Sequence, residues 1–201
     1  MDVITISRQL GSLGFQVGQA VAAKLNHRLV WRELINQAAI RSGAPEVALA
    51  MIDELNLLGL SPTPSQFKTY IQVVDQVIRE LAAEGGIVIV GRGGQFVLRR
   101  DPRVLHIRVV SPLEVRIQRI CSFRGISVEA ASAQIETSDR TRKNYLRRAY
   151  QVDWEDPALY DLVVNTDRMS LSTAAEIICQ AAALPYESNP IDAKICEDED
   201  H

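Results

Sequence analysis

The stretch VITISRQLGSLG, residues 3–14, decides the fold of this chain. Its first four residues form an apolar run that predicts a short strand, and residues 15–25 have the apolar spacing of a helix. A strand, a glycine-bearing turn and a helix in direct succession are typical of a phosphate-binding loop. In such a loop backbone N–H groups and the positive end of the helix dipole meet an anion. Gly11 and Gly14 would supply the positive φ or close backbone approach that the turn needs.

The spacing of this loop departs from the Walker A pattern, G-x-x-x-x-G-K-[ST]. Aligned without a gap, Arg8 stands at the first glycine and Gly14 at the lysine. In a loop one residue longer, Gly14 takes the second glycine and Phe15 the lysine. Because the lysine is missing in both alignments, the stretch alone fits a phosphate loop and an ordinary strand-to-helix turn equally well.

The composition predicts a soluble α/β domain with an appendage. The chain has 201 residues, of which 47% are hydrophobic and 23% charged. No apolar run approaches the roughly eighteen residues of a membrane span, and the N-terminus lacks the regions of a signal peptide. We therefore predict a cytoplasmic protein with no membrane partner. The three cysteines and three histidines show no ligand spacing, so a zinc site is not expected, and His106 is interpreted as a core or strand-edge residue.

The charges are distributed unevenly along the chain. Residues 187–201 contain six acids and one lysine, whereas residues 99–148 contain twelve Lys/Arg and five Asp/Glu, a local charge of +7. Such a cluster favours a polyphosphate or nucleic-acid partner over a merely solvated helix face.

Strand-like and helix-like segments alternate, which predicts an α/β, doubly wound sheet of five parallel strands with right-handed crossovers. The predicted strands are residues 3–6, 27–31, 87–90, 104–110 and 160–165. The predicted helices are residues 15–25, 32–40, 46–58, 66–84, 112–124, 127–149 and 170–182, with Ser65, Ser111, Ser127 and Ser170 as N-caps.

A second glycine-bearing turn, residues 91–94, follows the apolar run of residues 87–90. The carboxyl ends of central parallel strands are where α/β sheets bind ligands. Arg92 is either a ligand-binding residue or a solvated side chain in a tight turn. We favour ligand binding, because two glycine-bearing loops now follow two buried strands.

With these segments in order, the chain resembles the cytidylate kinase-like family, a branch of the P-loop nucleoside monophosphate kinases. The resemblance covers roughly residues 3–182 and rests on the order of its motifs. These are the phosphate loop at 4–14, the acceptor loop at 89–93, the arginine-bearing lid around 138–142 and the terminal strand at 160–166.

The resemblance implies a three-layer P-loop kinase fold, a five-stranded parallel sheet flanked by helices, over residues 1–185. A helical acceptor-side, NMP-binding insertion would lie at about 32–70 and the lid at about 116–150. We expect the acidic tail, residues 186–201, to be disordered.

The resemblance also implies roles for individual residues. Donor phosphates would bind the backbone of Gly11, Ser12, Leu13 and Gly14, with Arg8 or Ser12 assisting. The acceptor would bind at Arg92 and Gly93. ATP and Mg²⁺ are implied as cofactors, while the metal ligands stay open.

The lid arginines implied by the resemblance would neutralise the transferring phosphoryl group, a task that suits planar and permanently charged guanidinium groups. They are Arg116, Arg119, Arg140 and Arg142. Asp139 would either anchor one of them or receive the waters of the metal.

Three departures from the family pattern stand out. Phe15 replaces a commonly basic residue, Gln16 replaces the Walker serine or threonine, and residues 31–33 (Trp-Arg-Glu) replace an acidic-start motif of the type Asp-Arg-Glu. We hypothesise that Arg8 replaces the lysine from the opposite wall of the loop, in which case Arg8→Ala would abolish nucleotide binding.

Two functions fit the sequence best. The first is ATP-dependent phosphorylation of a nucleoside monophosphate, of the CMP or dCMP type, and the second is a catalytically inactive nucleotide-binding module with a regulatory or scaffolding role. The missing lysine favours the second, and the full arginine set favours the first. A nucleic-acid-binding protein ranks last, because the basic segment holds only two aromatic residues, Phe123 and Tyr145. The acceptor base and the oligomeric state stay open.

Overall fold

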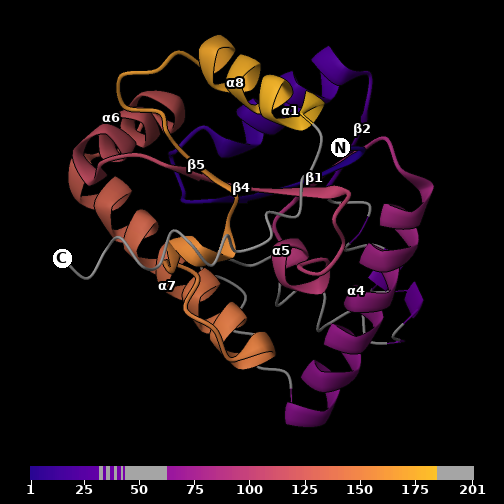
Figure 1. Ribbon diagram of the computed structural model, residues 1–201. Coiled ribbons are helices and arrows are strands. Elements are labelled where there is room, and N and C mark those ends of the chain that lie inside the picture. The colour runs from indigo at the N-terminus through magenta and orange to yellow at the C-terminus, as the bar shows by residue number, and fades with distance from the viewer. Residues whose placement is uncertain (32–33, 35–36, 39, 42, 44–62, 185–201) are drawn as a thin grey trace, which may run out of the picture.

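The computed structural model describes residues 1–31, 34, 37–38, 40–41, 43 and 63–184. The predicted helix at 46–58 and the acidic tail lie outside these described residues, and the predicted helix at 32–40 is described only in part. Five parallel strands form one sheet in the order β2-β3-β1-β4-β5 (Figure 1). The strands are β1 (Val3–Arg8), β2 (Arg28–Val30), β3 (Ile87–Val90), β4 (Val104–Val110) and β5 (Leu162–Asn165). The predicted doubly wound parallel sheet is confirmed.

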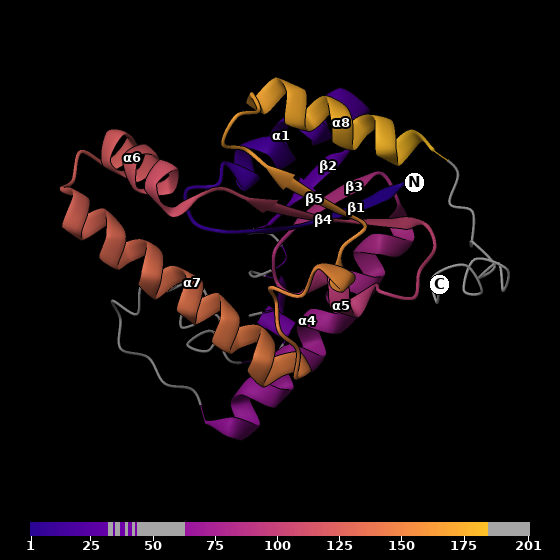
Figure 2. The same cartoon turned by 60° about the vertical axis from the view of Figure 1, so that its left-hand side comes forward.

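Helices cover both faces of the sheet, as expected for right-handed crossovers between parallel strands. Figure 2 shows α1 and α8 on one face and α4 and α5 on the other. The α6–α7 hairpin projects beyond one side of the sheet, and α7 runs back toward α4. The helices are α1 (Gly14–Leu25), α4 (Pro64–Glu84), α5 (Gly94–Val97), α6 (Leu113–Arg124), α7 (Val128–Tyr150) and α8 (Leu171–Ala183), with a 3₁₀ turn at Pro157–Leu159.

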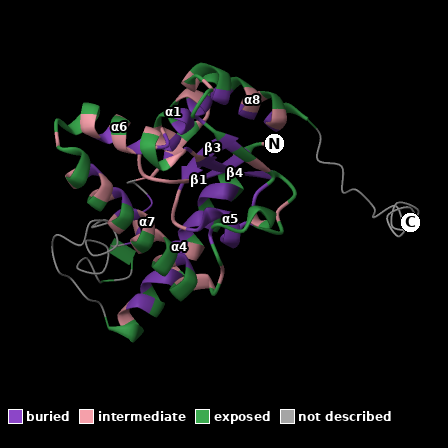
Figure 3. Cartoon of the chain, turned by 90° about the vertical axis from the view of Figure 1, so that its left-hand side faces the viewer, coloured by how far each residue is buried: buried purple, intermediate pink, exposed green. Residues whose placement is uncertain are grey.

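The two faces of the sheet are built from alternate residues of the same strands, because successive strand side chains point in opposite directions. On β3, Ile87 and Ile89 pack in the cluster around α4, whereas Val88 and Val90 pack in the cluster around α1 and α8. All four are at most 1% exposed. A strand buried on both faces is continuously apolar, which is why these residues are visible in the sequence. Figure 3 shows the strands buried and the outer helix faces exposed.

Helix starts confirm two predicted caps and correct two others. Ser127 accepts from the Ala130 amide and Ser170 from the Thr173 amide, as predicted. Helix α4 is capped by Thr63 rather than Ser65, because Thr63 and Gln66 form a reciprocal capping box with Pro64 in the first turn. Helix α6 begins at Leu113, one residue later than predicted, and Pro112 rather than Ser111 precedes it.

The position of His106 agrees with its interpretation as a core or strand-edge residue. His106 lies buried on β4, with Nδ1 2.7 Å from Thr5 Oγ1, as expected for a core residue. In the part of the chain that is described, no helix is long and apolar enough to span a bilayer.

Candidate active site

The loop of residues 9–13 joins β1 to α1, and most of its carbonyl oxygens are held by side chains. Ser12 Oγ donates to the Gln9 carbonyl at 2.9 Å, and Arg116 Nη1 donates to the Leu10 carbonyl at 3.3 Å. Thr166 Oγ1 donates to the Ser12 carbonyl at 2.9 Å. These bonds hold the loop in shape from the side of its carbonyl groups.

Five amides at this loop and the first turn of α1 have no acceptor among the described residues. They belong to Gly11, Leu13, Gly14, Phe15 and Gln16. The first N–H groups of a helix lack intrahelical partners and carry the positive end of the helix dipole. Free amides in a loop that leads into a helix are the arrangement that binds phosphate.

Arg119 lies outside the loop and fixes it to the end of β5. Its Nη1 donates to the Gly11 carbonyl at 3.3 Å and to Thr166 Oγ1 at 2.9 Å, and its Nη2 donates to the Thr166 carbonyl at 2.6 Å. Thr166 is fully buried. In this structure Arg119 therefore binds backbone and hydroxyl groups that shape the loop.

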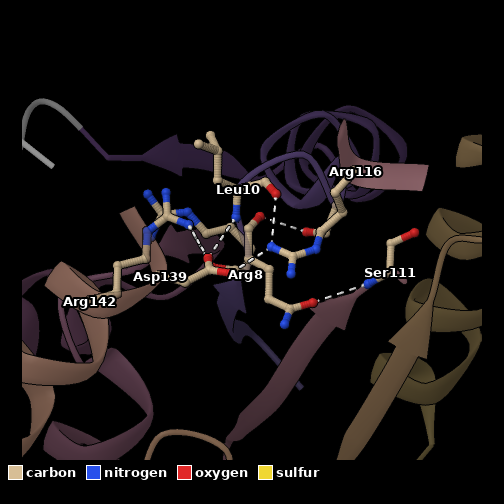
Figure 4. Close-up of polar contacts among 8 residues, drawn as sticks. Arg8, Leu10, Ser111, Arg116, Asp139 and Arg142 are labelled. Atoms are coloured by element: carbon tan, nitrogen blue, oxygen red, sulfur yellow. Dashed lines mark hydrogen bonds and ion pairs between the residues drawn. The ribbon is translucent and has the colours of Figure 1, made fainter. Parts of the chain in front are cut away.

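Asp139 joins helix α7 to the loop (Figure 4). Its Oδ2 lies 2.6 Å from Arg116 Nη1 and its Oδ1 accepts from the Leu10 amide at 3.3 Å. Arg142 approaches the same carboxylate at 3.8 Å and donates to the Arg8 carbonyl at 3.1 Å. Figure 4 shows Arg116 and Arg142 reaching Asp139 from opposite sides. Asp139 thus contacts an arginine of α6, an arginine of α7 and the backbone of the loop.

A cavity of about 230 Å³ lies beside the loop, at the carboxyl ends of β1 and β3. Helices α4 and α7 and the segment around Trp154 supply its other walls. Four arginines contribute to the lining: Arg8, Arg92, Arg142 and Arg148. Among the described residues no carboxylate lines it, so the cavity is suited to an anion.

Aromatic rings orient two of the cavity arginines. The Arg148 guanidinium lies 4.0 Å from the centre of the Phe67 ring, and that of Arg92 lies 5.8 Å from the centre of the Tyr145 ring. Arginine stacked on an aromatic face keeps its N–H groups available in the plane of the guanidinium. The rings thus hold the charged groups at the cavity wall.

The backbone of the second glycine-bearing turn is left-handed at three successive residues. The φ angles of Gly91, Arg92 and Gly93 are 82°, 59° and 75°. Arg92 lacks the freedom of glycine there, and such strain tends to occur at ligand sites. The turn is fixed by Tyr150, whose Oη donates to Asp75 at 2.8 Å and lies 3.5 Å from the Arg92 carbonyl.

The structure brings together most of the residues that the sequence singled out. Gly11, Ser12, Leu13 and Gly14 form the loop, and Arg8, Arg92, Gly93 and Arg142 line the cavity. Arg116, Arg119 and Asp139 lie behind the loop. Arg140 is not brought to the loop or the cavity, since it lies exposed on α7 and pairs with Glu136 at 3.5 Å.

Sequence reasoning missed several residues of the site. In the sequence Thr166 is visible only as the end of the strand motif at 160–166, and no motif includes Trp154. Arg108 is buried on β4, donates to the Trp154 carbonyl and lies 4.5 Å from the centre of the Trp154 ring. An arginine within a strand that is apolar apart from His106 was the available signal for this contact.

The residues fit the phosphates of a nucleotide better than they fit a dedicated metal site. The acceptor-free amides match phosphate oxygens, as described above. Within the described ranges no group of three or more His, Cys, Asp or Glu side chains is placed to hold a metal ion. Mg²⁺ commonly keeps several waters and is bound largely through substrate phosphates, so it would enter with the nucleotide.

Comparisons with known proteins agree with this geometry. Residues 3–168 match the model of the cytidylate kinase-like family. A cytidylate kinase from Pyrococcus horikoshii is 30% identical over 177 residues, which cover 84% of this chain and 81% of that protein.

Two further relatives are matched over a smaller part of their own length. The chain spans 30% of a uronate isomerase from Corynebacterium glutamicum, at 26% identity over 77% of this chain. It spans 54% of a cytidylate kinase from Methanopyrus kandleri, at 35% identity over 48% of this chain.

Solved structures share the fold at low sequence identity. An uncharacterized protein from Eubacterium ventriosum superposes with a TM-score of 0.71 at 20% identity, over 90% of this chain and 98% of that chain. A shikimate kinase from Acinetobacter baumannii superposes with a TM-score of 0.52 at 16% identity, over 90% of this chain and 92% of that chain. The fold is that of the P-loop kinases.

Proposed function

We propose that this chain, which belongs to the cytidylate kinase-like family, transfers a phosphoryl group from ATP to a nucleoside monophosphate of the CMP or dCMP type. The observation that carries this proposal is the closeness of two anion-binding features, since Arg8 lines the cavity and directly precedes the loop. A loop with acceptor-free amides adjoins a cavity lined by four arginines. Phosphoryl transfer needs two phosphate-bearing molecules held end to end, with positive charge where they meet.

The donor would bind on the loop side. The acceptor-free amides of Gly11 and of residues 13–16 would hold the β- and γ-phosphates at the start of α1. The missing side chains of Gly11 and Gly14 leave room for Arg116 and Arg8 behind the loop. Ser12 is turned inward and holds the loop through its bond to the Gln9 carbonyl. Mg²⁺ would supply further charge neutralisation on the phosphates when it enters with them.

The acceptor would bind on the cavity side. Arg92 and the backbone of Gly93 lie at the carboxyl end of β3 and would hold the acceptor phosphate. Arg142 and Arg148 approach from the lid helix, so they would complete the charge when α7 lies over the nucleotide. Arg116, Arg119 and Asp139 would act through the shape of the loop, because they bind its backbone or each other.

A catalytically inactive nucleotide-binding module is the second candidate function. The specific observation that favours it is the absence of a lysine in the loop, together with Phe15, whose ring packs against Trp31 with centroids 4.9 Å apart. In this alternative the loop binds a nucleotide but no phosphoryl group is transferred. The bound nucleotide would change the conformation of the protein, and that change would serve a regulatory or scaffolding role.

A coupled phosphotransfer assay distinguishes the two. The protein is incubated with ATP and Mg²⁺ and with CMP, dCMP, UMP, AMP or GMP, and ADP formation is followed. We expect turnover with CMP or dCMP that Arg92→Ala reduces by about 100-fold, the order of loss found when one preorganised donor is removed from an enzyme site. The matched control is Arg100→Ala, a nearby exposed arginine outside the cavity.

Absence of turnover with all five acceptors, combined with ATP-dependent thermal stabilisation, would support the binding module instead. Turnover that Arg92→Ala and Arg100→Ala reduce equally would contradict the placement of the acceptor.

A further inference from the structure

Arg8 and Gly14 occupy adjoining space at the base of the loop. A Cβ atom built on Gly14 would lie 2.4 Å from Cβ and 3.1 Å from Cγ of Arg8. Real Cβ atoms do not approach that closely, and Arg8 Cβ is fixed to the backbone and cannot rotate away. A side chain at position 14 and an arginine at position 8 therefore exclude each other in this backbone.

The backbone decides which alignment with the Walker pattern is correct. Leu13 has a φ of 62°, in the left-handed region that favours glycine, while Gly14 is the first residue of α1. The residue just before the helix is thus the one in a conformation that suits the second Walker glycine. This places Gly14 at the lysine and Arg8 at the first glycine.

The alignment reveals a reciprocal exchange. Where the Walker pattern has glycine, this chain has arginine, and where the pattern has lysine, this chain has glycine. The steric contact between positions 8 and 14 means that an arginine at position 8 requires glycine at position 14, and that a lysine at position 14 requires glycine at position 8.

The Arg8 side chain runs from the loop to the cavity. Its Cβ and Cγ lie next to Gly14, and its guanidinium lies next to Gly91. A Cβ atom added to Gly91 would be 2.3 Å from Nη1 and 3.2 Å from Cζ of Arg8. Gly91 follows β3 and lines the cavity, as does Arg8 itself. The side chain therefore connects the start of α1, at Gly14, with the cavity wall at Gly91. The lid reaches the same residue, because Arg142 donates to the Arg8 carbonyl at 3.1 Å.

We infer that Arg8 is a catalytic residue that takes over the task of the missing lysine and contacts the phosphoryl group in transfer. This inference rests on the proposed function. An oxygen of the acceptor phosphate forms a bond to the γ-phosphorus of ATP, and the bond from that phosphorus to the β,γ-bridging oxygen breaks. ADP leaves with the electron pair, and the acceptor becomes a diphosphate. Arg8 stays protonated throughout and stabilises the charge on the transferring oxygens.

The exchange is tested by reverting it. Four variants are compared with the wild type: Arg8→Lys, Arg8→Gly, Gly14→Lys, and the double variant Arg8→Gly/Gly14→Lys. We expect Arg8→Gly to lower kcat by about 100-fold, with a smaller change in KM for the acceptor, because the lost charge acts in transfer. Arg8→Lys should retain more activity than Arg8→Gly. The double variant should recover at least about tenfold over Arg8→Gly, since it returns glycine and lysine to their Walker positions. Arg100→Ala serves as the charge control.

Stability supplies a second readout that needs no turnover. Gly14→Lys alone should lower the melting temperature, because its Cβ meets Arg8, and adding Arg8→Gly should restore it. A double variant that is no more active than Arg8→Gly, although it melts like the wild type, would overturn the inference. So would an Arg8→Gly protein with wild-type kcat.

If the wild type shows no turnover, the proposed function is wrong, but the role of Arg8 in phosphate binding can still be tested through ATP binding. The probe is then the shift in melting temperature with ATP and Mg²⁺. Loss of the shift in Arg8→Gly and its return in the double variant would support the exchange at the level of phosphate binding. An undiminished shift in Arg8→Gly would refute it.

Discussion

Arg119 donates hydrogen bonds to both oxygen atoms of Thr166, to Oγ1 at 2.9 Å and to the carbonyl at 2.6 Å. Thr166 follows β5, and its hydroxyl donates in turn to the Ser12 carbonyl at 2.9 Å. A single buried hydroxyl thus connects α6, the end of β5 and the phosphate loop. The shape of the loop depends on a residue more than 150 positions away in the sequence.

Thr166→Val should weaken both the fold and the loop. Valine keeps the shape of threonine but removes the hydroxyl, which leaves the Ser12 carbonyl without its donor and Arg119 with one acceptor fewer. We expect the free energy of unfolding to fall by about 1–3 kcal/mol and the affinity for ATP to fall several-fold. Urea denaturation and ATP titration check this. Thr69→Val, at an exposed position on α4, is the control, and equal effects in the two variants would refute the role of Thr166.

Two of the ion pairs that involve α7 should differ in their contribution to stability. Asp139 pairs with Arg116 at 2.6 Å, and their side chains are 21% and 8% exposed. Glu136 pairs with Arg140 at 3.5 Å, and these side chains are 77% and 62% exposed. Asp139→Asn should lower the free energy of unfolding by about 1–3 kcal/mol, because it leaves a buried guanidinium without its countercharge.

Glu136→Gln should change the free energy of unfolding by less than about 0.5 kcal/mol, since water screens an exposed pair. Chemical denaturation of the two variants side by side measures the difference. Similar losses from both would show that the buried pair contributes no more than the surface pair.

The fold was predictable because its signals are local and periodic. The five strands were found from apolar runs such as residues 87–90, which are buried on both faces, and from the helix patterns between them. Errors arose at helix starts, where the competing candidates are one or two residues apart. Thr63 prevails over Ser65 because it completes a capping box with Gln66, and Ser111 lies before Pro112 and outside α6.

The candidate site was predictable only in part, because its members meet through the tertiary fold. Glycine and arginine in the turns after β1 and β3 indicated Arg8 and Arg92. Nothing in the sequence distinguishes an arginine that faces the cavity, such as Arg142, from one that faces solvent two residues earlier, Arg140. That difference is set by the rotation of α7 against the loop, which Asp139 fixes.

Gly93→Ala should be more damaging than Gly125→Ala. Both residues have positive φ angles, 75° and 64°, so both substitutions incur a backbone cost of about 1–2 kcal/mol. A Cβ on Gly125 would meet nothing within 4 Å, whereas one on Gly93 would lie 2.4 Å from Cε2 of Tyr150. We expect an additional loss of about 1–3 kcal/mol for Gly93→Ala, from overpacking.

A double-mutant cycle with Tyr150→Ala isolates that contact. The cost of Gly93→Ala should fall to the level of Gly125→Ala once the ring is removed. An unchanged cost in the Tyr150→Ala background would show that the ring is not what restricts position 93.

His106 should make the stability of the protein depend on pH below neutrality. Burial lowers the pKa of His106 beneath its ordinary value of 6.5, although the nearby Asp161 carboxylate opposes this shift. As the pH falls below 6.5, His106 becomes protonated in the unfolded chain but stays neutral in the folded protein. The free energy of unfolding therefore decreases until the pH reaches the pKa of His106 in the folded state. The slope from one such group is at most about 1.4 kcal/mol per pH unit.

Urea denaturation between pH 8 and pH 5 measures this loss of stability. His106→Gln is the comparison, because glutamine can still hydrogen-bond Thr5 but does not titrate. We expect the wild type to lose more stability than His106→Gln over this range, and parallel pH profiles would mean that other groups cause the loss.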